Sequence, residues 1–193
     1  MLEAADRLCA LGRWLPTQRD AVFLLALTGQ RRAEVTTMEW GHIDLSRGLW
    51  TQPSTANKAK RMHVVPLTYR LLSLLQTRWE AAGKPTEGLV LPSVRAGGVM
   101  TANVSDLAET LRAETGIAFR FHDLRRSLTT SCADVGVSFE VLDGVLNHAA
   151  SQSRGGLRAV YNRAQLVDAM RQALRVWDSV VFDENVVPLR RPA

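Results

Sequence analysis

The segment TQRDAVFLLALTG occupies residues 17–29 and decides what kind of fold this chain builds. Thr17, with Asp20 three residues later, is typical of a helix start, and Gly29 is typical of a helix end. Between them, Ala21–Leu27 is the longest apolar run of the chain, and it is too short to cross a membrane. We therefore predict a helix here, within a globular domain.

Across the rest of the chain, the sequence predicts a mainly α fold with one small antiparallel β-sheet, an α+β class. A basic hairpin tip that carries Lys58, Lys60 and Arg61 joins two of the strands. Strands are expected at about residues 43–45, 49–52 and 62–67. A short extended piece is expected at 89–91. Further helices are expected at about 32–38, from 69 to Gly83, and at 103–115, 123–135, 138–147 and 164–178.

Length and composition indicate one ordinary domain. The chain has 193 residues, 46% hydrophobic and 22% charged, and its mean hydropathy is -0.06. Cys9 and Cys132 lie far apart and predict reduced core residues of an intracellular protein. Charged residues near the start, including Glu3 and Asp6, do not suit a signal peptide. These features argue against secretion, membrane insertion and zinc-finger chemistry.

The net charge of +5 is concentrated in the middle of the chain. Residues 51–130 carry eleven basic and six acidic side chains, whereas basic and acidic residues balance in 1–50 and in 131–193. A localised basic region favours a phosphate-rich partner, although a merely solvated basic surface would give the same count.

Five local patterns contain residues suited to phosphate chemistry, and each also has a purely structural interpretation. Arginine can hold phosphate oxygens through paired hydrogen bonds, and lysine can donate a proton. Alone, a hairpin lysine usually serves solubility, a lone histidine usually caps a helix, and a tyrosine among apolar residues usually packs in a core. The five patterns are Thr28-Gly29-Gln30-Arg31, Asn57-Lys58-Ala59-Lys60-Arg61, His122-Asp123-Leu124-Arg125, Leu146-Asn147-His148 and Val160-Tyr161-Asn162.

In chain order, these patterns supply Arg, Lys, His-x-x-Arg, His and Tyr, and this order resembles the catalytic domain of the tyrosine recombinases, the phage integrase family. The resemblance covers about residues 17–178 and includes flanking segments such as Val64-Val65-Pro66-Leu67. It implies the tyrosine recombinase fold and site-specific cleavage and rejoining of DNA. The matching site residues are Arg31, Lys58, His122, Arg125, His148 and Tyr161.

The resemblance also implies a role for each matching residue. Arg31 and Arg125 would bind the non-bridging phosphate oxygens, and His148 would donate a further hydrogen bond. Tyr161 would attack phosphorus to form a 3′-phosphotyrosine, and Lys58 would protonate the departing 5′-oxygen. His122 would act as a base or orient the site.

Other expectations concern partners and cofactors. The candidates for DNA-backbone contacts, as opposed to chemistry, are Arg32, Lys60, Arg61 and Arg126. Asp123 is expected to cap a helix. The sequence has neither a P-loop nor an acidic cluster of two-metal type, so we expect no metal, ATP or other cofactor. Double-stranded DNA is the expected partner, with a homo-tetramer and accessory DNA-bending proteins implied for the full-length protein, in the cytoplasm at the nucleoid.

We expect residues 1–178 to form the catalytic domain and 179–193 a C-terminal tail. Residues 1–16 leave no room for the core-binding domain that usually precedes the catalytic one. Residues 180–182 could form a strand, and the apolar stripe of the last helix could pack on a neighbouring subunit or on its own domain. Two alternative functions remain open: a non-catalytic DNA-binding remnant and a type IB topoisomerase-like enzyme.

Overall fold

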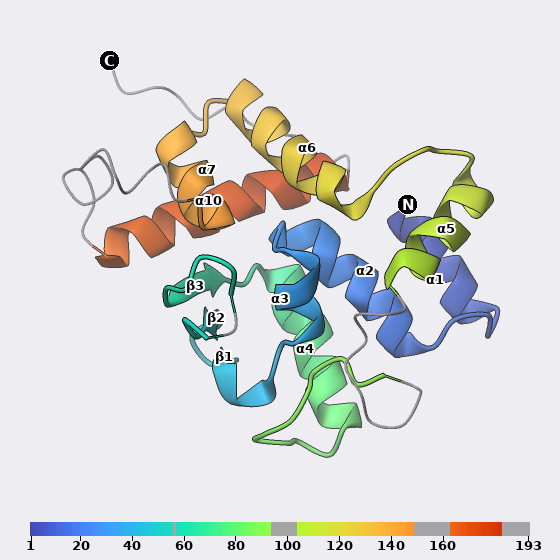
Figure 1. The fold of residues 1–193 in the computed structure, drawn as a ribbon. Helices are drawn as coiled ribbons and strands as arrows, with labels where there is room; N and C mark the ends of the chain where they lie inside the picture. The colour runs from blue at the N-terminus through green and yellow to red at the C-terminus, as the bar shows by residue number, and fades with distance from the viewer. Residues whose placement is uncertain (56, 94–103, 149–162, 183–193) are drawn as a thin grey trace.

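Helix α2 (Pro16–Thr28) forms the centre of the fold, and every residue from Asp20 to Thr28 is buried. The computed structural model describes residues 1–55, 57–93, 104–148 and 163–182. Figure 1 shows helices on several sides of α2, with the small sheet to one side. The other helices are α1 (Leu2–Ala10), α3 (Arg32–Thr36), the 3-10 helix η1 (Trp40–His42), α4 (Tyr69–Ala81), α5 (Val104–Thr115), α6 (Phe121–Asp134), α7 (Phe139–Leu146) and α10 (Arg163–Val181).

Gly29 ends α2 in a left-handed conformation, with φ 61° and ψ 14°. A Cβ atom there would lie only 2.8 Å from Cδ1 of Leu128 on α6 and 3.2 Å from Cδ2 of Leu146 on α7. Glycine therefore meets two demands at once, because it adopts positive φ readily and lets two helices approach the backbone. The predicted helix end at Gly29 is confirmed, and three helices converge on it.

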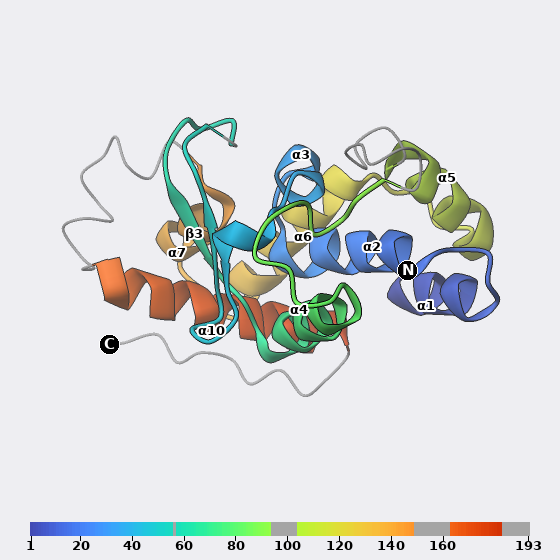
Figure 2. The same cartoon turned by 90° about the horizontal axis from the view of Figure 1, so that it is seen from below.

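The sheet contains β1 (Ile43–Asp44), β2 (Leu49–Gln52) and β3 (His63–Pro66), in the order β1-β2-β3 and antiparallel throughout. Trp50 lies opposite Val65, and both side chains are buried in the core. The described part of the connection between β2 and β3 is a long hairpin loop that extends past the body of the molecule (Figure 2). The fold thus has the expected class, mainly α with a small antiparallel sheet.

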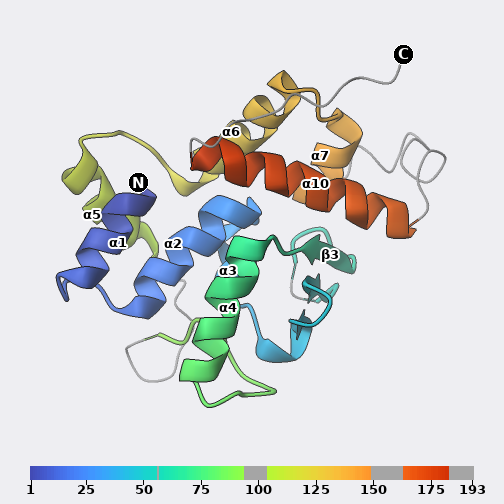
Figure 3. The ribbon, with the colours of Figure 1, turned by 180° about the vertical axis from the view of Figure 1, so that it is seen from behind.

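Helix α10 closes the core on one side, where it packs on α7, β3, α6 and α2 (Figure 3). Its stripe of Met170, Leu174 and Trp177 is buried, and Nε1 of Trp177 donates to the carbonyl oxygen of Ala26 at 2.8 Å. The stripe therefore packs on its own domain. The helix continues to Val181, so the strand considered for residues 180–182 is wrong.

Some helix boundaries differ from expectation. The helix α1 was not expected at all, and α2 begins at Pro16, where the Leu15 amide donates to Oε1 of Gln18 at 2.8 Å. Thr17 is not the cap; its hydroxyl accepts a hydrogen bond from Nη2 of Arg78 at 2.6 Å. Asp20 forms a partly buried ion pair with the same arginine at 2.7 Å.

The two cysteines differ in burial. Cys132 lies in the core, and its burial raises the pKa of the thiol to about 12. Cys9 is only half-buried, so the expectation of a core residue is confirmed for Cys132 alone. Both cysteines are free thiols.

None of the described helices combines the length and the apolar character that crossing a bilayer requires.

Candidate active site

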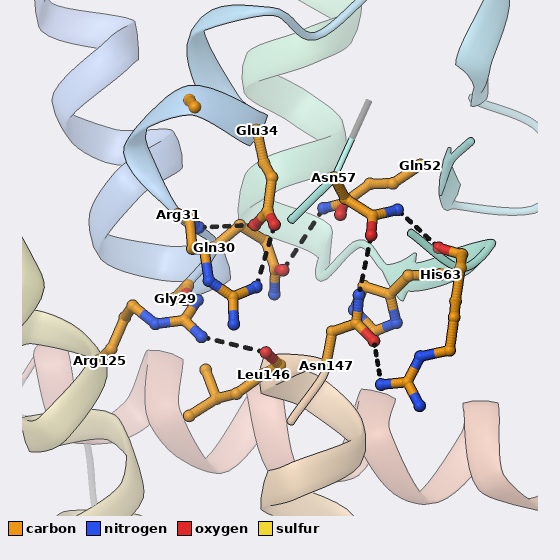
Figure 4. Close-up of polar contacts among 12 residues, drawn as sticks. Gly29, Gln30, Arg31, Glu34, Gln52, Asn57, His63, Arg125, Leu146 and Asn147 are labelled. Atoms are coloured by element: carbon orange, nitrogen blue, oxygen red, sulfur yellow. Dashed lines mark hydrogen bonds and ion pairs between the residues drawn. The ribbon is translucent and has the colours of Figure 1, made fainter. Parts of the chain in front are cut away.

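Arg125 joins the end of α2 to the end of α7. Its Nη1 donates to the carbonyl oxygen of Gly29, and its Nη2 donates to that of Leu146 at 3.0 Å (Figure 4). The residue is only 5% exposed, although it lies in the first two turns of a helix whose residues are mostly polar. Within the described parts of the chain, these bonds use two of the five N–H donors of the guanidinium. Arg125 is thus a fixed cation whose other donors can bind an anion.

Arg31 is fixed next to Arg125 by the buried carboxylate of Glu34. Oε1 of Glu34 lies 3.0 Å from Nη1 of Arg31, and its Oε2 accepts from the Arg31 amide at 2.9 Å. The second bond caps the short helix α3. Figure 4 shows the two guanidinium groups next to one another, with the Glu34 carboxylate beside that of Arg31. The carboxylate therefore orients one arginine and partly offsets the charge of two.

The electrostatics of this cluster follow from burial. Desolvation, followed by the positive charge of Arg31, lowers the pKa of Arg125 to about 10. A guanidinium with that pKa remains protonated at neutral pH. Two cations held close together in a partly buried position repel one another, so an anion bound between them relieves this repulsion and its binding free energy is favourable.

His63 on β3 and Gln30 after α2 both bind the last turn of α7. Nε2 of Gln30 donates to the carbonyl oxygen of Val145 at 2.8 Å, and Nε2 of His63 lies 3.2 Å from the same oxygen. Because a carbonyl only accepts, that nitrogen of His63 carries the proton. Burial lowers the pKa of His63 to about 4, so the ring is neutral at pH 7.

His148 directly follows Asn147, the C-cap of α7, and Asp143 orients its ring. Nδ1 of His148 lies 2.9 Å from Oδ1 of Asp143, while its main-chain amide donates to the Asp143 carbonyl oxygen at 3.0 Å. A carboxylate accepts, so Nδ1 carries a proton and the ring is held in one orientation. The imidazole is 43% exposed, which lets it reach a bound ligand.

Lys58 lies in the turn at the tip of the β2–β3 hairpin. The Lys60 amide donates to the Asn57 carbonyl oxygen at 3.1 Å, and this bond closes a turn with Lys58 at its second position. Lys58 is exposed, as is Lys60, which has positive φ. The hairpin tip comes against the end of α7, near His148, through the contact between Asn57 and Asn147 (Figure 4).

The structure places the remaining predicted residues at different depths. His122 is exposed in the first turn of α6, three residues before the buried Arg125. Arg126 is exposed, and Arg32 is exposed with Nη1 donating to the hydroxyl of Ser105 at 3.2 Å. Arg61 is half-buried.

Asp123 caps its helix as expected, with Oδ2 accepting from the Arg120 amide at 2.9 Å. Tyr161 and the loop from Ala149 to Gly156 lie outside the described residues; α10 begins at Arg163, two positions after the tyrosine.

Three supporting residues receive no role from sequence alone: Gln30, Glu34 and His63. The spacing Arg31-x-x-Glu34 is that of a capping box and would have been a usable signal. Gln30 and His63 offer no such signal, because their shared partner, Val145, lies more than eighty positions away in the chain.

Across the described ranges, no three histidine, cysteine or acidic residues gather as a metal site would require.

Two solved structures share the fold of this chain. The integrase from mycobacterium phage Brujita superposes with a TM-score of 0.63 at 19% identity, over 100% of this chain and 58% of that one. The XerA recombinase superposes with a TM-score of 0.61 at 19% identity, over 88% of this chain and 63% of that one. The fold is that of the tyrosine recombinases.

Sequence comparison then identifies the family. The model of the phage integrase family matches residues 9–156, and the chain belongs to this family. It is 30% identical over 162 residues to prophage integrase IntZ and 27% identical over 159 residues to prophage integrase IntA, both of Escherichia coli (strain K12). These matches cover 81% and 80% of the chain, but only 38% and 36% of the two relatives. The chain thus spans little more than a third of their length.

Proposed function

We propose that this chain is the catalytic domain of a site-specific DNA recombinase that cleaves and rejoins DNA through a covalent 3′-phosphotyrosine. The observation that carries the proposal is the pair of neighbouring guanidinium groups, that of Arg31 held by Glu34 and that of Arg125 held by main-chain carbonyls. A phosphodiester under attack gains negative charge on its non-bridging oxygens, and two preorganised cations stabilise that charge. His148, whose Nδ1 proton is held by Asp143, would donate to the same phosphate from Nε2 when the ring also carries a proton there.

The chemical step needs a nucleophile and an acid. The phenolic oxygen of Tyr161 would attack phosphorus while the bond to the 5′-oxygen breaks, and Lys58 would give that oxygen a proton. Because the ordinary pKa of a tyrosine is about 10, the phenol must lose its proton during attack, to a base such as His122 or to water. The products are a 3′-phosphotyrosine and a free 5′-hydroxyl. Attack by a 5′-hydroxyl reverses the step without any external energy source.

Double-stranded DNA would lie across the face that bears the hairpin tip and the start of α6. Arg32 and Arg126 are exposed and directly follow Arg31 and Arg125 in the chain. Lys60 is exposed on the same hairpin as Lys58, so all three suit contacts to the DNA backbone. Such contacts would raise affinity in a salt-dependent way without reading sequence. For the full-length protein we propose a homo-tetramer on two duplexes.

Covalent trapping tests the proposal. Nicked duplexes that tile the DNA on both sides of the gene would be incubated with the chain and examined for an SDS-resistant adduct. We expect an adduct that Tyr161→Phe abolishes and that Tyr69→Phe retains, since Tyr69 is the only other tyrosine and is 84% exposed at the start of α4. An adduct that survives Tyr161→Phe, or no adduct on any duplex, would contradict the proposal. Relaxation of supercoiled plasmid without any defined site would instead favour a topoisomerase.

A further inference from the structure

Two buried asparagines directly precede two of the proposed catalytic side chains. Asn57 comes before Lys58 and Asn147 comes before His148, and each asparagine is only 6% exposed. Although 90 positions separate them in the chain, Nδ2 of Asn147 lies 3.5 Å from Oδ1 of Asn57 (Figure 4). The backbone that carries the lysine and the backbone that carries the histidine therefore meet at these two amides.

Asn57 builds the turn on which Lys58 lies. Its Nδ2 donates to the carbonyl oxygen of Pro53 at 2.8 Å and to that of Arg61 at 2.6 Å, so its side chain spans the hairpin loop from one strand side to the other. Its own carbonyl accepts the Lys60 amide at 3.1 Å. Three hydrogen bonds from one residue thus set where the backbone of the exposed lysine lies.

Asn147 holds the other end of the contact. It caps α7 in the left-handed conformation, with φ 52° and ψ 46°, which asparagine tolerates better than most residues. Its Oδ1 accepts from Nη2 of Arg61 at 3.3 Å, while its Nδ2 faces Asn57. Both halves of this amide are directed at the hairpin rather than at its own helix.

We propose that Asn57, Arg61 and Asn147 form a polar tie that holds Lys58 at a fixed distance from His148, and that all three are positioning residues for proton transfer from Lys58. This inference rests on the proposed function. It assigns Arg61 to the tie rather than to the DNA backbone, in keeping with its half-buried position.

The tie would restrict the position of Lys58 relative to the oxygen that it protonates. A general acid must come within hydrogen-bonding reach of the oxygen it protonates, and a misplacement of about 1 Å can cost about a hundredfold in rate. Arg31 and Arg125 fix the phosphate from the core, whereas Lys58 is carried by an exposed hairpin. Without a link between the two parts, the lysine would sample many positions relative to the leaving oxygen.

Asn147→Gly is the variant that removes the tie with least disturbance. Glycine adopts the same positive φ without strain, so the cap of α7 is kept while both side-chain contacts are lost. Asn147→Asp is the matched control, since it keeps an acceptor for Arg61 and tolerates the same backbone conformation. Amide hydrogen exchange should be about tenfold faster at Lys60 in Asn147→Gly than in the unchanged chain, with a smaller increase in Asn147→Asp. Unchanged exchange at Lys60 would overturn the tie.

A second readout separates positioning of the acid from general loss of structure. The duplex that forms the adduct would be made with sulfur in place of the bridging 5′-oxygen at the scissile phosphate. A thiol has a pKa of about 8.5, far below that of an alcohol, so a thiolate leaves without being protonated. Asn147→Gly should slow adduct formation on the oxygen substrate by about tenfold or more and differ little from the unchanged chain on the sulfur substrate.

The outcomes are distinguishable. Equal slowing of Asn147→Gly on both substrates, or slowing on neither, would overturn the proposed role of the tie. If the unchanged chain forms no adduct with either substrate, the proposed function itself fails, whatever the hydrogen exchange shows.

Discussion

Arg125 and Lys58 would act on the same phosphodiester, but the protein holds them in opposite ways. Arg125 is buried, and its guanidinium bonds to main-chain carbonyls at the ends of two helices. Lys58 is exposed on a hairpin turn whose position depends on side-chain amides. The group proposed to bind the phosphate is built into the core, whereas the group proposed to protonate the departing oxygen lies on a surface loop. Stability and catalysis should therefore respond differently at the two sites.

The largest expected effect is on stability at the buried side. Arg125→Ala would leave the carbonyls of Gly29 and Leu146 without a donor in a dry site, so we expect the free energy of unfolding to fall by about 3 kcal/mol. Lys58→Ala should change it by less than about 0.5 kcal/mol, because the side chain is exposed. Urea denaturation followed by circular dichroism would measure both. Similar losses of unfolding free energy in the two variants would contradict the difference between the buried and the exposed site.

A smaller effect should come from the glycine beneath Arg125. Gly29→Ala meets a positive φ and a contact of 2.8 Å to Leu128, so we expect a loss of about 2 kcal/mol. Gly12→Ala is the matched control, because it has a similar φ of +68° and no heavy atom within 4 Å of the added Cβ. Its loss should be about 1 kcal/mol, from the backbone alone. Equal losses in thermal or urea unfolding would show that Leu128 moves aside freely.

The smallest effect concerns pH. Burial lowers the pKa of His63 from 6.5 to about 4, so below pH 6.5 the unfolded chain takes up a proton that the folded chain refuses. The stabilising contribution is fully present above pH 6.5 and declines as the pH falls towards 4. Between pH 7 and 5.5 the loss should be about 1 kcal/mol.

His63→Gln provides the control for this window, because its amide can still donate to Val145 but does not titrate. Its unfolding free energy should fall less steeply between pH 7 and 5.5 than that of the unchanged chain. Parallel pH profiles would show that another group is responsible.

Much of the fold could be predicted because local signals and core packing agree. Gly29 ends a helix as the sequence predicts. The strands at 49–52 and 63–66 lie within the ranges predicted for them from the sequence. The sequence predicts the wrong element where packing against the rest of the domain outweighs local propensity. The β-branched residues Val180 and Val181 favour a strand locally, but they continue the buried stripe of α10 and remain helical.

The candidate site was less predictable than the fold. The order of chemical residues along the chain could be taken from the sequence, but the bonds that fix them could not. Val145 is bound by residues from two other elements, and Asn57 meets Asn147 only after the hairpin folds onto α7. Such pairs leave no periodic pattern, since nothing local connects their positions.

The arginines are proposed to stabilise the phosphate charge, and the lysine is proposed to protonate the leaving oxygen. One substrate change can test these separate roles. The rate of adduct formation would be measured for Arg31→Ala and Lys58→Ala on a normal phosphodiester and on a methylphosphonate, which lacks the negative charge, with the unfolding midpoint of each variant as a control. We expect the defect of Arg31→Ala, about a hundredfold or more on the phosphodiester, to shrink at least about tenfold on the neutral substrate. The defect of Lys58→Ala should stay the same, because the leaving oxygen is unchanged. Defects that shrink equally in both variants, or in neither, would contradict the assignment of the two sites.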